Sequence, residues 1–242
     1  MELHFLGRGN SSNAKEGNTS AYFIENQELF LIDCGETVFS KMMKLELLND
    51  IKEIHVLITH THSDHIGSLG SLIMYCYFNK KIKLNIILPT TAKHKNSIIT
   101  ILQCMGCNNK MYEIKEEEYY KDKYQSFQSI KYLETKHVDY LDCYGIQFET
   151  KEGILYYSGD TREINNIQKI INENNQIDKI YVDVTSTNIK DNIHLYIKDL
   201  EENIPKELKN KVYCMHFNNE DCIKKAISIG FHVVKVEQKN NR

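Results

Sequence analysis

Residues 59–65 read Thr-His-Thr-His-Ser-Asp-His and place three imidazoles and a carboxylate within six residues. They follow Ile54–Ile58, a continuous apolar run that predicts a buried strand. Left without partners beside a core, these polar groups would each cost roughly a few kcal/mol of desolvation. A shared divalent metal removes that cost, because neutral imidazole and carboxylate are its natural ligands. The segment therefore predicts a metal site rather than a surface histidine cluster without metal.

The spacing within this segment indicates two metal positions. Residues i and i+2 at a strand end point the same way, so His60 and His62 can face one ion. The turn that follows directs Asp64 and His65 toward a second position. A catalytic zinc commonly keeps three protein ligands and an open position for water. Two such sites need more ligands than this segment supplies.

Three downstream residues can complete the set, because each follows a predicted strand at the rim of a sheet. They are His137 after Phe127–Leu133, Asp160 after Ile154–Ser158, and His216 after Val212–Met215. The glycine before Asp160 lets the backbone turn its carboxylate inward. Alone, each residue is more typical of a satisfied core or surface position, and their joint arrangement is what indicates ligands.

The elements that must position these residues are short strands at first and alternating helices and strands later. The predicted strands are Leu3–Leu6, Ala21–Ile24, Leu29–Ile32, Ile54–Ile58, Asn85–Leu88, Phe127–Leu133, Tyr144–Glu149, Ile154–Ser158, Lys179–Val184, Val212–Met215 and His232–Val236. The predicted helices are Ile66–Phe78, Thr91–Met105, Glu163–Glu173, Ile193–Asn203 and Glu220–Ser228. This order predicts an α/β fold with two sheets covered by helices. The charged run Lys115–Lys123 predicts a solvated loop or an exposed helix.

The composition predicts one cytoplasmic domain over residues 1–242. Apolar residues make up 41% of the 242 and charged residues 26%, which allows a buried core, and no internal repeat or linker is visible. The net charge of −3 argues against nonspecific coating of nucleic acid. No run approaches the roughly 20 apolar residues of a membrane span, and the N-terminus lacks a secretory signal pattern. Seven scattered cysteines do not indicate a disulfide framework.

The whole chain resembles the metallo-β-lactamase superfamily, and most of all its ribonuclease Z and phosphodiesterase branch. The landmarks are Leu6-Gly7-x-Gly9, Asn18-Thr19-Ser20, Leu31-Ile32-Asp33-Cys34-Gly35, the His60–His65 motif, Ser158-Gly159-Asp160 and Cys214-Met215-His216-Phe217. The resemblance implies an αββα sandwich of two mixed β-sheets, with the site at one end. It also implies one metal on His60, His62 and His137, a second on Asp64, His65 and His216, and Asp160 as the bridge.

Two divalent ions at such a site predict a hydrolase. Water or hydroxide held between them has its pKa lowered from about 15.7 toward neutrality and becomes the nucleophile. We expect Asp64 to hydrogen-bond this water and later pass a proton to the leaving oxygen, and Asp33 to orient a ligand histidine. Zinc is the first expectation, with manganese or iron as alternatives.

The resemblance also favours phosphodiester chemistry. In the ribonuclease Z branch a histidine in a His-Ser-Thr segment pairs with an acidic residue near the scissile phosphate, and His194 and Asp183 occupy the matching places. Such a pair can neutralise a phosphate oxygen or protonate a leaving alkoxide. Here Leu195 and Tyr196 replace Ser-Thr, and His194 starting a helix is the alternative.

The protruding Gly/Pro-rich arm of ribonuclease Z is missing, which disfavours structured tRNA and favours a small nucleotide or cyclic phosphodiester as substrate. An ester, thioester or lactone hydrolase of the same fold is the alternative enzyme. A non-catalytic metal-binding partner or sensor protein is the alternative outside enzymes. A homodimer is left open, because dimers are common in this branch.

Overall fold

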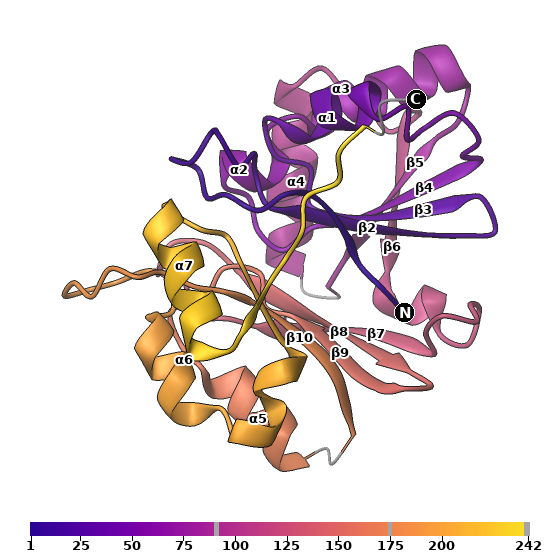
Figure 1. The fold of residues 1–242 in the computed structure, drawn as a ribbon. Helices are drawn as coiled ribbons and strands as arrows, with labels where there is room; N and C mark the ends of the chain where they lie inside the picture. The colour runs from indigo at the N-terminus through magenta and orange to yellow at the C-terminus, as the bar shows by residue number, and fades with distance from the viewer. Residues whose placement is uncertain (90–91, 174–175, 240–242) are drawn as a thin grey trace.

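The computed structural model describes residues 1–89, 92–173 and 176–239. Two six-stranded sheets lie face to face in the order β1-β2-β3-β4-β5-β6 and β12-β11-β10-β9-β8-β7. Figure 1 shows helices α1 to α4 on the outer face of the first sheet and α5 to α7 on the outer face of the second. The predicted αββα sandwich is confirmed.

The first sheet comes from the first half of the chain. Its strands are β1 (His4–Gly7), β2 (Ser20–Glu25), β3 (Glu28–Ile32), β4 (Glu53–Leu57), β5 (Leu84–Leu88) and β6 (Tyr112–Glu116). Its helices are α1 (Val38–Lys44), α2 (Ser63–Ile66), α3 (Leu69–Tyr75), continued by a π-helical turn (Cys76–Lys80), and α4 (Ala92–Cys104). Strands β1 to β3 are antiparallel, and β3 to β6 are parallel.

The second sheet repeats this topology. Its strands are β7 (Ser129–Glu134), β8 (Tyr144–Thr150), β9 (Gly153–Tyr157), β10 (Ile177–Asp183), β11 (Val212–Met215) and β12 (His232–Val233). Its helices are α5 (Asn165–Glu173), α6 (Ile197–Asn203) and α7 (Glu220–Ile229). Strands β7 to β9 are antiparallel, and β9 to β12 are parallel. The two halves thus share a topological repeat that the sequence did not reveal.

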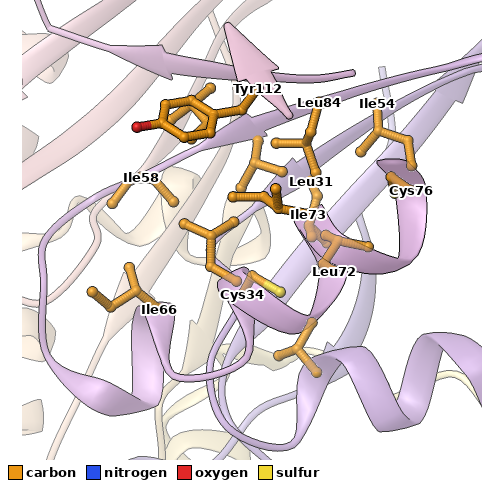
Figure 2. Packing of buried hydrophobic residues seen from close by; sticks show 14 of the residues in the cluster. Leu31, Cys34, Ile54, Ile58, Ile66, Leu72, Ile73, Cys76, Leu84 and Tyr112 are labelled. Atoms are coloured by element: carbon orange, nitrogen blue, oxygen red, sulfur yellow. The ribbon is translucent and has the colours of Figure 1, made fainter. Parts of the chain in front are cut away.

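Strand residues alternate between two apolar layers, because successive side chains point to opposite faces of a sheet. In β3, Leu29 and Leu31 pack toward the helices, whereas Phe30 and Ile32 pack between the sheets. Figure 2 shows the helix-side layer, where strand residues such as Leu31 meet the α3 segment. Full burial of such a side chain contributes roughly 1.5–3 kcal/mol. A continuous apolar run is therefore the pattern of a strand buried on both faces.

Three predicted elements differ in part from the structure. The run Lys115–Lys123 is mostly exposed, as predicted, but it includes the end of β6 and a 3-10 turn (Glu117–Tyr120) in which Tyr120 is fully buried. The predicted helix Ile66–Phe78 is interrupted between α2 and α3. The predicted helix from Ile193 begins only at Ile197. Thr91, predicted to start a helix, lies outside the described residues.

The C-terminal segment crosses from the second sheet to the first, as the yellow tail in Figure 1 shows. Its Glu237 N–H donates to the Phe5 carbonyl at 2.8 Å, and Lys239 pairs with Glu46 at 2.7 Å. In the described ranges no helix combines the length and apolar character needed to cross a membrane. All seven cysteines carry free thiols.

Candidate metal centre

The carboxyl ends of strands from both sheets meet at one point and supply the candidate ligands. Residues 59–65 follow β4 of the first sheet and run into α2. The second sheet contributes His137 from the β7–β8 loop, Asp160 after β9 and His216 after β11. Because all these positions follow a strand end or a hairpin, residues far apart in the chain converge where the sheets meet.

The seven predicted ligands form two adjoining groups. His60, His62, His137 and Asp160 make one, and Asp64, His65 and His216 make the other; within each group the potential ligand atoms lie within 4.8 Å of one another. All except His62 are buried. The chemistry of this donor set, five imidazoles and two carboxylates, fits divalent transition metals.

Asp160 lies between the two groups and turns one oxygen to each. Its Oδ2 is 3.9 Å from His60 Nε2 and 3.6 Å from His137 Nε2. Its Oδ1 is 3.3 Å from His65 Nε2 and 3.4 Å from His216 Nε2. A carboxylate placed in this way can serve two ions at once.

Asp33 is the anchor behind both groups. Its Oδ2 accepts from His65 Nδ1 at 2.8 Å and from the Thr59 hydroxyl at 2.7 Å. The Thr59 hydroxyl lies 3.1 Å from His60 Nδ1, and the Thr59 N–H donates to Asp33 Oδ1 at 2.8 Å. One fully buried carboxylate thus orients a histidine in each group, which leaves their Nε2 atoms directed at the centre.

A similar arrangement recurs at His137, whose Nδ1 donates to the Ile193 carbonyl at 2.7 Å. His216 Nδ1 lies 3.3 Å from Asp183 Oδ1 but forms no hydrogen bond with it. The buried Nε2 of His65 has no hydrogen-bond partner among the described residues, although a buried imidazole nitrogen is normally satisfied. An unsatisfied inward-facing nitrogen is what a metal ligand presents, so the residues fit the implied ions.

The backbone shows strain at two residues of this centre. Asp33 has φ 61° and His216 has φ 60°, the left-handed region that costs an ordinary residue roughly 1–2 kcal/mol. Gly35 packs so closely on Asp64 that a Cβ there would overlap the Asp64 carbonyl. The two turns are also joined by the Cys34 N–H, which donates to the His65 carbonyl at 2.6 Å.

Asp183 and His194 meet beside the metal groups. His194 Nδ1 lies 2.7 Å from Asp183 Oδ2, and the same oxygen accepts from the Thr161 N–H at 3.1 Å. Burial disfavours the charged imidazolium, but the charge of Asp183 and its hydrogen bond outweigh burial and raise the pKa of His194. Burial would raise the pKa of Asp183, but the charges of His194 and His216 lower it. Both directions favour the charged forms of the pair, an imidazolium and a carboxylate.

The two acidic candidates among the ligands are also held in the charged form. Burial would raise the pKa of Asp160, but the charges of His216 and His65 bring it well below the ordinary value. In Asp64 burial is again the largest effect, but the hydrogen bond from His216 and the charges of His65 and His216 together outweigh it and lower the pKa. Both directions agree with the expectation that Asp64 stays ionised.

A pocket of about 300 Å³ opens onto this centre. It is lined by Ser11, His62, Ser63, Asp64, His137, Tyr140, Asp160, Ile193, His194 and His216. The sequence did not predict Ser11, Tyr140 or Ile193 as residues of the site. Beside the pocket, Arg162 forms an ion pair with Asp139 at 2.9 Å.

The fold and this histidine–aspartate centre define a hydrolase of the metallo-β-lactamase superfamily, as the sequence predicted. More narrowly, the chain belongs to the anti-Pycsar protein Apyc1 family, whose profile matches residues 1–238. The anti-Pycsar protein Apyc1 of Bacillus phage 010DV004 is 27% identical over 93% of both chains.

Ribonuclease Z of Methanocaldococcus jannaschii is 34% identical over 49% of this chain, and the match spans only 38% of that relative's length. Two solved structures share the fold at low identity. The metallo-β-lactamase fold protein YhfI from Bacillus subtilis matches with a TM-score of 0.71 at 16% identity, covering 98% and 96% of the two chains. A diphosphatase of the PhnP family matches with a TM-score of 0.72 at 14% identity, covering 98% and 95%.

Proposed function

We propose that this chain, as one domain, is a metal-dependent phosphodiesterase that acts on a small nucleotide. His60, His62 and His137 would hold one divalent ion and Asp64, His65 and His216 the other, with Asp160 within reach of both. Zinc is the first candidate, because imidazole predominates in both groups. The chain has the anti-Pycsar role stated in the name of its relatives. It carries out this role by hydrolysing phosphodiester bonds.

The observation that carries the proposal is the Asp183–His194 pair at the rim of the metal groups. A pair of metal ions would lower the pKa of a water molecule and offset the charge of an attacked phosphate. The pair adds a fixed cation at the same pocket, since Asp183 is buried and holds His194 at 2.7 Å. An ester or lactone has no charged phosphate that such a cation could neutralise, so the pair favours a phosphodiester substrate.

The chain's own residues divide the remaining work. His194 is directed at a phosphate oxygen, to which its free ring N–H donates, or at the leaving alkoxide, which it protonates. Asp64, held ionised, accepts a proton from the attacking water; where His194 only contacts the phosphate, Asp64 returns that proton to the leaving oxygen. Asp183 does not touch substrate; it keeps His194 charged and oriented.

The size of the pocket supports a small substrate. About 300 Å³ lies at the lower end of small-molecule sites and accommodates a mononucleotide. The net charge of −3 also disfavours a folded RNA, because binding of nucleic acid depends largely on neutralising its phosphates.

Hydrolysis assays on three substrates test this function. Wild type and His194→Ala, each loaded with zinc or manganese, would be compared on a cyclic nucleoside monophosphate, on bis-p-nitrophenyl phosphate and on p-nitrophenyl acetate. We expect wild type to cleave both phosphodiesters and His194→Ala to lose that activity while binding the same amount of metal. Turnover of the ester alone, indifferent to His194, would assign the chain to ester hydrolysis. Stoichiometric metal without any turnover would favour a binding or sensor protein.

A further inference from the structure

The mouth of the metal pocket carries an aromatic ring that the catalytic chemistry does not use. Tyr140 is 77% exposed, yet it lines the pocket, and its ring centroid lies 6.3 Å from that of His62. Exposure of a large aromatic side chain leaves its apolar area in water and contributes nothing to the core. Its position beside the reaction centre therefore calls for a role in binding.

The loop that presents Tyr140 is held firmly at its base. The β7–β8 connection closes where the Thr135 N–H donates to the Cys143 carbonyl at 2.8 Å. The Thr135 hydroxyl donates to the Asp160 carbonyl at 3.0 Å, and Asp139 pairs with Arg162 at 2.9 Å. These contacts hold the base of the loop that carries Tyr140 beside Asp160.

Ile193 supplies an apolar group to the same pocket. Its side chain is 39% exposed and lines the pocket, while its carbonyl accepts from His137 Nδ1 at 2.7 Å. A hydrogen bond from a candidate ligand thus sets the position of this residue. One aromatic side chain beside His62 and one aliphatic side chain whose backbone is bonded to His137 thus line the same, otherwise polar pocket.

We propose that Tyr140 and Ile193 bind the nucleobase of the substrate, with Tyr140 stacking on its face. This inference rests on the proposed function and specifies its substrate as a nucleotide recognised through its base. Aromatic side chains stack on bases because every base has a π face, and an aliphatic neighbour excludes water from the contact. Tyr140 is then a specificity residue, distinct from the residues that touch the phosphate.

A fluorescence experiment tests binding without turnover. The chain contains no tryptophan, so Tyr140→Trp creates a single tryptophan reporter that can still stack. The matched control is Tyr119→Trp, because Tyr119 is 49% exposed and lies outside the pocket. Titration with adenosine monophosphate should quench Tyr140→Trp in a saturable manner and leave Tyr119→Trp unchanged. Equal quenching of both variants, or of neither, would overturn the assignment.

Kinetics then separate base recognition from chemistry. Tyr140→Ala should raise KM for a cyclic nucleoside monophosphate about tenfold, within the range of base–aromatic stacking, with kcat retained. The corresponding cyclic ribose phosphate without a base should show no such change. Ile193→Ala should behave in the same direction, whereas Ile189→Ala, exposed on the same loop but outside the pocket, should match wild type.

The two proposals can fail separately. If wild type cleaves the base-free cyclic phosphate but Tyr140→Ala loses equal activity on both substrates, the phosphodiesterase function stands and base binding by Tyr140 is wrong. If wild type cleaves neither substrate, the proposed function fails, and the quenching of Tyr140→Trp still decides whether the rim binds a nucleotide.

Discussion

His194 Nδ1 lies 2.7 Å from Asp183 Oδ2, in a pair whose carboxylate is fully buried and whose imidazole faces the pocket. The carboxylate is immobilised from behind, because the Asp183 N–H donates to Ser158 Oγ at 2.9 Å and the Thr161 N–H donates to Asp183 Oδ2. A cation held in a fixed position away from water can stabilise negative charge that develops on the substrate. This stabilisation depends on Asp183 remaining charged.

Asp183→Asn should therefore shift the pH dependence of phosphodiester cleavage. Asp183 raises the pKa of His194, so the imidazolium survives to higher pH in the wild type. Without that charge, the activity that needs the imidazolium is lost at lower pH, and kcat near neutrality falls about a hundredfold, as for loss of a general acid. A pH–rate profile measures the shift. Asp178→Asn, a carboxylate at the far end of the same strand, is the control and should keep the wild-type profile.

Asp33→Ala should weaken metal binding although Asp33 belongs to neither metal group. The carboxylate orients His65 directly and His60 through Thr59, and loss of such a partner typically costs 10–100-fold in metal affinity. Competition with a chromogenic chelator measures the affinity. Asp33→Asn keeps an oxygen acceptor, and asparagine tolerates the left-handed backbone at this position. Its metal affinity should therefore fall less than that of Asp33→Ala. Wild-type affinity in Asp33→Ala would contradict the anchoring role.

Gly35→Ala should disturb the metal centre from outside it. The new methyl group overlaps the Asp64 carbonyl, so the turn that carries Asp64 and His65 must shift. We expect metal content, measured by atomic emission, to fall below that of wild type. Gly230→Ala provides the contrast: it lies in a left-handed helix cap with φ 96° and nothing near its Cβ. It should cost about 1 kcal/mol of stability and leave metal content unchanged.

Removal of metal by a chelator should lower the melting temperature, because a ligand that binds only the folded state stabilises it. The gain is about 4 kcal/mol at a free concentration a thousand times the Kd. Differential scanning calorimetry with and without chelator measures the effect, and added zinc or manganese should reverse it. In His216→Ala the chelator should cause a smaller shift. Equal melting temperatures with and without chelator would count against metal binding at this centre.

A second pH effect should appear in stability and come from His55, far from the metal groups. His55 lies between Tyr120 and Glu28 at 3.0 Å each, and burial lowers its pKa more than Glu28 raises it. Above the ordinary histidine value of 6.5 neither state binds the proton. As pH falls through 6.5 the unfolded chain binds it first, so this contribution to stability is lost on acidification.

Urea unfolding in the presence of chelator at about pH 7.5 and about pH 5.5 measures that loss. His55→Gln, which removes the titrating ring, should show a smaller difference between the two pH values than wild type. A difference as large as that of wild type would assign the acid sensitivity to other groups.

The elements predicted well from sequence are those whose pattern is local. β11 matches its predicted bounds because Val212–Met215 is buried and bounded by polar residues. β6 was missed because it is an edge strand of its sheet and three of its five residues are charged. Tyr120 was assigned to a solvated run, since its contact with His55, 65 residues away, leaves no mark on the local pattern.

The candidate site divides in the same way. The His60–His65 motif is compact, and the strand-end positions of His137, Asp160 and His216 could be inferred from their apolar flanks. The link from Asp33 through Thr59 to His60 could not be inferred, because it depends on β3 and β4 lying side by side. Tyr140 was missed for a related reason: only the folded β7–β8 loop brings its ring to the pocket.

Each sheet is assembled from one continuous half of the chain, with its strands in sequence order. Strand pairing within a half joins segments that are closer in sequence than the two halves are to each other, which costs less entropy and favours early formation. The candidate ligands are split between the halves, since residues 60–65 belong to the first and His137, Asp160 and His216 to the second. The centre can exist only after the halves have docked. Metal binding during refolding should therefore appear at the last assembly step. Two separately produced half-chains should bind metal only once they associate with each other.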